Sequence, residues 1–142
     1  MGFFSKILGG GKEYPPLEPG HPATERMSQV QSSLDQLATE IPDPLEAVPG
    51  ENGVYVFAGK PPTKFGMFWI HGSEIHNFKT LSKAKGLNSL DLQPIVEQLR
   101  NVYRQNEGEK RFSYPAAGRS IVVTPSKNMG TAVEEVIQKA AS

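Results

Sequence analysis

The sequence predicts a small α+β domain: an antiparallel sheet of about four strands with three helices, in the order α-β-β-α-β-β-α. Residues 54–71 and 110–124 each contain two short runs of β-branched and aromatic side chains around a turn, which is typical of paired strands. Residues 24–41, 92–103 and 131–140 repeat apolar side chains at helical spacing. The helical segments flank and separate the two strand pairs.

The composition is typical of one soluble domain with a tail. The chain has 142 residues, of which 37% are hydrophobic and 21% are charged. It contains no cysteine, which excludes disulfides and thiolate metal sites, so we expect a cytoplasmic protein. Any contact with a membrane is expected to be peripheral. Fifteen basic and fifteen acidic residues cancel, so we expect no nucleic-acid partner. No cofactor is expected either.

The first 23 residues are predicted to be an apolar segment followed by a flexible linker rich in glycine and proline. Four apolar side chains share one side of a short helix: Phe3, Phe4, Ile7 and Leu8. This run is too short for a signal peptide or a transmembrane span. It can bind a membrane interface or a groove on a partner protein, or it is a frayed end without a role. Residues 24–142 are expected to form the single folded domain.

The first predicted helix begins at Thr24 as N-cap and ends before Pro42. Its apolar residues form one narrow seam: Met27, Val30, Leu34, Leu37 and Ile41. This seam can pack on the sheet of its own chain or pair with a helix of another chain. Met27 and Leu34 are therefore candidate interface residues.

The hairpin predicted between Val54 and His71 is apolar on both faces. A strand that is apolar on both faces must be covered on both, by helices, by a second layer or by a partner chain. The sequence therefore favours a homodimer or a protein partner. Phe68 and Trp69 are candidates for either the core or that interface. Residues 43–52, just before the hairpin, are predicted to be a loop.

The second half of the chain is predicted to contain a helix, two strands and a final helix. Residues 73–78 could continue a strand, and residues 79–86 are expected to be a basic connection. The next helix is expected to start near Asp91 or Leu92, and Thr131 with Glu134 has the spacing of a capping box for the last helix.

The order of elements from Thr24 onward is similar to that of profilin-like, longin-like and roadblock-like small domains. The sheets of these domains carry helices on both faces, and many of the domains dimerise or serve as docking platforms. The resemblance implies a docking role.

The only cluster of chemically active side chains lies at the end of the hairpin: His71, Ser73, Glu74 and His76. Two imidazoles and a carboxylate could bind a metal, or Ser73 could act with a histidine as base. On one continuous strand Glu74 and His76 share a face and His71 lies opposite, so the group converges only if the chain bends at Gly72. The alternative hypothesis is therefore a metal-dependent enzyme or metal-binding protein.

The charges are unevenly distributed along the chain. Residues 25–51 contain six acids and one base, and residues 60–85 contain five lysines and one glutamate. These regions either neutralise each other in the fold, or the lysines form a docking patch for an acidic partner. Together these observations favour a non-enzymatic adaptor or accessory subunit, tethered by its N-terminal segment. A carrier of small apolar ligands, lined by the hairpin aromatics, is the third hypothesis.

Overall fold

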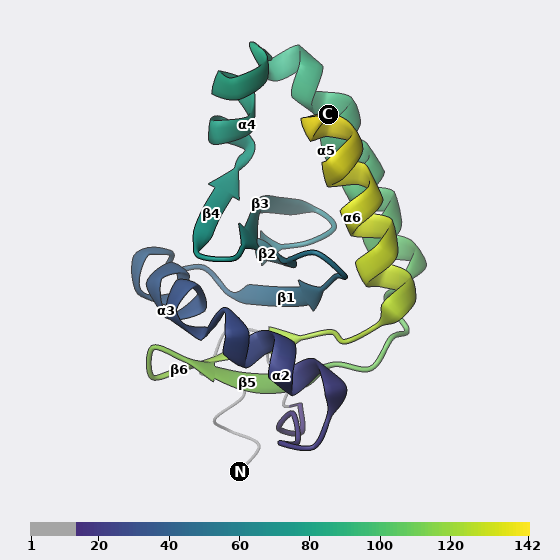
Figure 1. Ribbon diagram of the computed structural model, residues 1–142. Coiled ribbons are helices and arrows are strands. Elements are labelled where there is room, and N and C mark those ends of the chain that lie inside the picture. Colours follow the sequence, from purple (N-terminus) through teal and green to yellow (C-terminus); the bar gives the residue numbers. More distant parts are fainter. Residues whose placement is uncertain (1–13) are drawn as a thin grey trace.

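A six-stranded mixed sheet and five helices make up residues 14–142, the part of the chain that the computed structural model describes (Figure 1). The helices are α2 (Pro22–Gln29), α3 (Gln31–Glu40), α4 (Phe78–Lys85), α5 (Ser89–Gln105) and α6 (Lys127–Ala141). The strands are β1 (Leu45–Pro49), β2 (Val54–Lys60), β3 (Lys64–His71), β4 (Glu74–Asn77), β5 (Phe112–Ala116) and β6 (Arg119–Val123). The strand order is β4-β3-β2-β1-β6-β5, with β1 and β6 parallel and the other neighbours antiparallel.

The α+β class is confirmed, but the predicted antiparallel sheet of about four strands with three helices is wrong. The largest error concerns β1, which falls in the predicted loop at residues 43–52. Its sequence resembles a loop because it contains Glu46 and ends in Pro49. In the structure β1 lies between β2 and β6 and joins the two antiparallel parts of the sheet. The buried carboxylate of Glu46 accepts three hydrogen bonds there.

The predicted basic connection is also wrong, because residues 78–85 form α4. Its polar sequence hides the helix, and Leu81 is its one buried residue. The helix begins with a reciprocal cap: the Thr80 N–H donates to the Asn77 side chain, and the Asn77 N–H donates to the Thr80 hydroxyl, both at 2.9 Å. Gly86 ends it in the left-handed conformation, with φ of 67°.

The first predicted helix is in fact two helices. At Val30 the backbone leaves the helical region, with φ of −113° and ψ of 17°. A β-branched side chain loses rotamer freedom in a helix, so interrupting the helix at such a residue costs less free energy. The N-cap is His21 rather than Thr24, and its Nδ1 accepts the Ala23 N–H at 3.0 Å. The predicted domain start at residue 24 therefore falls inside α2.

The two later helices start earlier than predicted. α5 begins at Ser89, because Asn88 and Asp91 form a reciprocal cap with two bonds of 2.9 Å. α6 begins at Lys127, with the Ser126 hydroxyl accepting the Met129 N–H at 3.1 Å. The predicted capping box at Thr131 is wrong, because Glu134 bonds to a different part of the chain.

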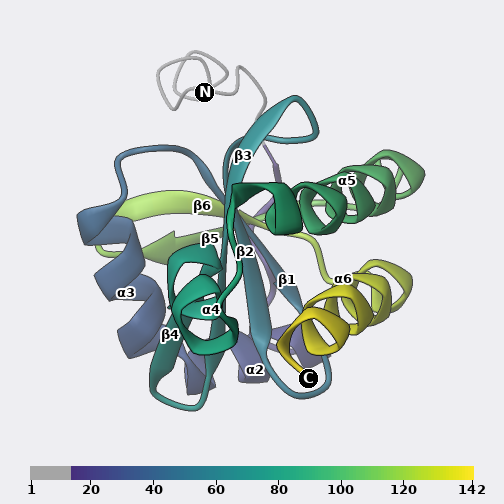
Figure 2. The same cartoon turned by 90° about the horizontal axis from the view of Figure 1, so that it is seen from above.

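The predicted hairpin is confirmed as β2 and β3, which pair from Val54 with Ile70 to Lys60 with Lys64. Successive side chains of these strands point to opposite faces of the sheet and belong to two separate hydrophobic cores. One face contributes Val54, Val56, Ala58 and Ile70, and the other contributes Tyr55, Phe57, Met67 and Trp69. α2 and α3 pack on the first face, whereas α4, α5 and α6 pack on the second (Figure 2). The chain thus covers both faces itself, so the sheet needs no second copy.

The part of the predicted linker that the structure describes is attached to the sheet. Pro16 bridges Ser113 of β5; the Leu17 N–H donates to the Ser113 carbonyl, and the Ser113 N–H donates to the Pro15 carbonyl, both at 2.9 Å. Leu17 is buried in the core beneath α2 and α3. This segment therefore covers the outer edge of β5, which would otherwise expose unpaired backbone groups.

A close contact between α6 and the end of β1 can be tested by adding one methyl group. A Cβ at Gly130 would lie 2.3 Å from the carbonyl oxygen of Pro49. Gly130→Ala should therefore lower the free energy of unfolding by roughly 1–3 kcal/mol, even though alanine is the better helix former. Asn128→Ala, exposed in the same turn, should change it by less than about 0.5 kcal/mol. A urea midpoint for Gly130→Ala at or above that of the parent would contradict this packing.

Candidate functional site

The tether residues predicted from sequence lie outside the described part of the chain, so no position is assigned to Phe3, Phe4, Ile7 or Leu8. The candidate interface residues are within it and face inward. Met27 of α2 and Leu34 of α3 are fully buried against the sheet. Trp69 is buried under α4 and α5, and Phe68 is half-buried on the other face of the sheet. All four contact the core of their own chain.

The hairpin of β3 and β4 brings His71, Glu74 and His76 to one face. His71 pairs with Glu74 across the turn, and Trp69 pairs with His76, so these side chains share a face. The two imidazole centroids are 5.9 Å apart, and His76 Nε2 is 3.4 Å from Glu74 Oε1. The sequence brings these three side chains together only if the chain bends at Gly72, and the structure has that bend, because Gly72 and Ser73 reverse the chain between β3 and β4.

The surroundings of this histidine pair are aromatic and polar. Among residues 14–142, no group of three or more His, Cys, Asp or Glu has the geometry to hold a metal ion. The His76 ring instead stacks on Trp69, with centroids 6.1 Å apart. His71 Nε2 is buried and has no hydrogen-bond partner within the described chain. Ser73, the candidate nucleophile, is exposed in the turn.

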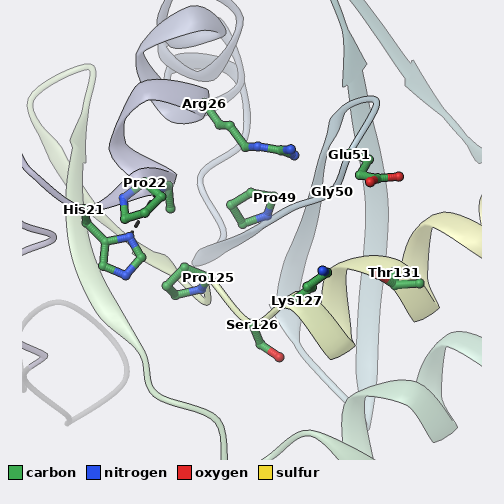
Figure 3. Close-up of a pocket in the computed structure, with 11 residues that line it drawn as sticks. His21, Pro22, Arg26, Pro49, Gly50, Glu51, Pro125, Ser126, Lys127 and Thr131 are labelled. Atoms are coloured by element: carbon green, nitrogen blue, oxygen red, sulfur yellow. Dashed lines mark hydrogen bonds between the residues drawn. The ribbon is translucent and has the colours of Figure 1, made fainter.

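A surface pocket of about 400 Å³ lies where the parallel strands β1 and β6 end. Arg26 of α2, Lys127 of α6 and Glu51 of the β1–β2 loop extend around it, and His21 lies at its side (Figure 3). The carboxylate offsets one of the two cations in a site open to water, where attraction between charges is weak. No described side chain of this pocket is a buried polar group without a partner.

Glu134 of α6 is a buried carboxylate that holds the β1–β2 loop. Its Oε2 accepts the Tyr55 hydroxyl at 2.9 Å and the Asn52 N–H at 2.8 Å, and its Oε1 accepts the Glu51 N–H at 3.1 Å. Burial, and then this carboxylate, raise the pKa of the Tyr55 phenol far above its ordinary value. The bonds fasten α6 to the hairpin and leave no proton-transfer partner facing a cleft.

Glu46 of β1 is the second buried carboxylate. It accepts the Tyr103 hydroxyl of α5 at 2.6 Å, the Thr124 hydroxyl after β6 at 2.6 Å and the Arg111 Nε–H at 3.0 Å. The Arg111 side chain is only 9% exposed. Burial, and then the charge of Glu46, raise the pKa of Tyr103 far above its ordinary value. This network ties three elements to the middle of the sheet, so its role is structural.

The α4–α5 elbow, which we define as residues 79–90, projects beyond the sheet at the end opposite α2 and β5 (Figure 1). It contains Lys79, Lys83 and Lys85, all exposed, and no acid. None of these lysines forms a salt bridge in the described chain. Leu90 is 70% exposed and is the large hydrophobic side chain that residues 14–142 leave in solvent. Sequence reasoning located these lysines but missed α4, although the Asn77 and Asn88 caps were a usable signal.

The acids of residues 25–51 do not neutralise the elbow lysines. Glu25 and Glu40 lie on the helices that cover the opposite face of the sheet from α4. Glu46 is paired with Arg111. The elbow is therefore a separate basic surface, which corresponds to the predicted alternative of a docking patch.

No protein-family model, curated protein or solved structure matches this chain. The similarity to profilin-like, longin-like and roadblock-like domains therefore rests on element order alone, and that order differs in the structure. The function has to be argued from the residues of the chain itself. The four pockets described among residues 14–142 are partly open to solvent.

The role of Glu134 is testable with its exposed neighbour as a matched control. Glu134→Ala should lower the free energy of unfolding by about 1–3 kcal/mol, because it leaves the Tyr55 hydroxyl buried without a partner. Glu135→Ala removes an equal charge from a solvated position and should change it by less than about 0.5 kcal/mol. Equal urea midpoints for the two variants would contradict the bonding described here.

The buried phenols of Tyr55 and Tyr103 predict that the folded protein loses stability in alkali. Their pKa values in the folded state exceed that of an unfolded tyrosine, about 10. Between these values the folded state binds more protons, so their contribution to stability is complete below about pH 10 and falls as the pH rises further. Absorbance of tyrosinate should show fewer than the four tyrosines of the chain ionising near pH 10 in the folded protein. A single step for all four would contradict the burial of Tyr55 and Tyr103.

Proposed function

We propose that this protein is a non-enzymatic accessory subunit, held at a membrane surface or a larger complex by its apolar N-terminal segment. The observation that carries the proposal is the use of the buried charged groups. Glu46, Arg111 and Glu134 are all engaged in bonds that fasten helices to the sheet. Enzymes place such groups in clefts with perturbed pKa values, whereas here the carboxylates that shift the tyrosine pKa values act inside the fold.

The surface supports the same proposal. The elbow presents unpaired lysines beside an exposed leucine, which is a feature of a contact site rather than of a reaction site. The sequence offers four apolar residues at the other end of the chain for tethering: Phe3, Phe4, Ile7 and Leu8. No helix of the described residues has the length and apolar character needed to cross a membrane. A rigid domain with one docking surface and a tether is the design of an accessory subunit.

The tether is tested in the native host with the full chain. Replacing Phe3, Phe4, Ile7 and Leu8 by serine should move the protein from the membrane pellet, or from a large complex, to the free monomer, as measured by ultracentrifugation and size exclusion. The control replaces Gly9, Gly10 and Gly11 by serine, which keeps the apolar side chains, and should behave as the parent. A parent that already runs as a free monomer contradicts the tethering.

The absence of catalysis is tested by metal analysis of the purified full chain. No stoichiometric zinc is expected, because the His71 and His76 rings lack a third ligand in suitable geometry within the described chain. Stoichiometric zinc that is lost on His76→Ala would favour the metal-binding hypothesis instead.

A further inference from the structure

We infer that the α4–α5 elbow is a second attachment point, whose occupant is the anionic headgroup surface of a lipid bilayer. This inference rests on the proposed peripheral attachment, and it adds the class of lipid and the residues that contact it. Lys83 and Lys85 at the end of α4 would face the headgroups, and Leu90 would enter the interface between them.

Charge complementarity points to an anionic occupant. The twelve residues 79–90 carry three lysines and no acid. Asp91 follows directly and is exposed, so residues 79–91 carry a net charge of +2. Its carboxylate accepts the Asn88 N–H at 2.9 Å as a helix cap. Because the elbow lysines have no salt bridge in the described chain, no internal partner has to be displaced on binding.

The exposed side chain of Leu90 favours binding to the interface of a bilayer over binding of dissolved anions by the lysines alone. Leu90 stands in the first turn of α5 and is 70% exposed. The elbow that contains it lies at the outer end of the molecule (Figure 1). Half-buried Leu87 lies in the connection between the helices, at the edge of the core. An apolar side chain beside lysines is the usual composition of a segment that binds the surface of an anionic bilayer.

A lipid surface fits the elbow better than a protein does. Lysine is depleted in protein interfaces, whose energetic centres are aromatic or arginine side chains in closed pockets. The elbow has neither aromatic nor arginine side chains, and none of its residues lines the surface pockets described above. A bilayer requires no matching pocket, and each lysine near its surface contributes separately.

The proposed tether has only four apolar side chains: Phe3, Phe4, Ile7 and Leu8. One weak anchor gives only marginal membrane binding, and a polybasic patch is a common second signal.

The test is co-sedimentation of the full chain with vesicles. Vesicles of phosphatidylcholine with about one third phosphatidylglycerol should bind the parent protein, and salt near 1 M should weaken that binding because it screens charges beyond about 3 Å. Lys83→Gln with Lys85→Gln should weaken binding about 30-fold, at roughly five-fold per lysine. Leu90→Ser should weaken it roughly ten-fold. The matched control, Lys110→Gln with Lys127→Gln, removes the same charge from exposed positions elsewhere and should behave as the parent.

The outcomes separate the elbow from the tether. If Phe4→Ser with Ile7→Ser abolishes binding to pure phosphatidylcholine but leaves salt-sensitive binding to the anionic vesicles, the elbow acts even without the tail. Equal loss in the elbow variant and the lysine control would overturn the inference and leave the tether intact. Equal binding of the parent to neutral and anionic vesicles would also overturn it. So would binding of an acidic peptide or an oligonucleotide, lost in the elbow variant, by a protein that ignores both kinds of vesicle.

Discussion

The architecture depends on one constraint: the hairpin of β2 and β3 has no face that tolerates water. Its alternate side chains are apolar in both directions, so folding requires two separate covers. The chain provides them from its two ends. α2 and α3 come from the N-terminal side, α5 and α6 come from the C-terminal side, and the sheet lies between them (Figure 2). A second copy of the chain, which the sequence favours, is not needed for this purpose.

Two carboxylates hold the second cover in place. Glu46 reaches α5 and the segments around β5 and β6, and Glu134 reaches from α6 to the β1–β2 loop. A buried carboxylate is costly unless it is fully bonded, and each of these accepts three hydrogen bonds from donors that are distant in sequence. The same bonds engage these charged groups inside the fold.

Charged side chains are unevenly distributed over the surface of the protein. The acids of α2 and α3 and the lysines of α4 lie on opposite sides of the sheet, which prevents their pairing. The net charge of zero conceals this separation. In the proposal made above, the elbow and the apolar N-terminal segment are two weak contacts of the same kind. Two such contacts combine into stable attachment where neither suffices alone.

The sequence by itself determined the β2–β3 hairpin, its two apolar faces and the apolar seam from Met27 to Ile41, because these follow from local periodicity. It did not determine β1, since Glu46 and Pro49 fit a strand only once Tyr103, Thr124 and Arg111 have been brought to it by the fold. It gave the bend at Gly72 only as a condition, because cross-strand pairing, rather than spacing along one strand, sets which side chains share a face. It located the lysines of the elbow but not α4 or the exposure of Leu90, because that exposure depends on which residues pack nearby. Periodicity is a local property, whereas satisfaction of a buried charge and exposure of a surface residue depend on contacts between distant segments.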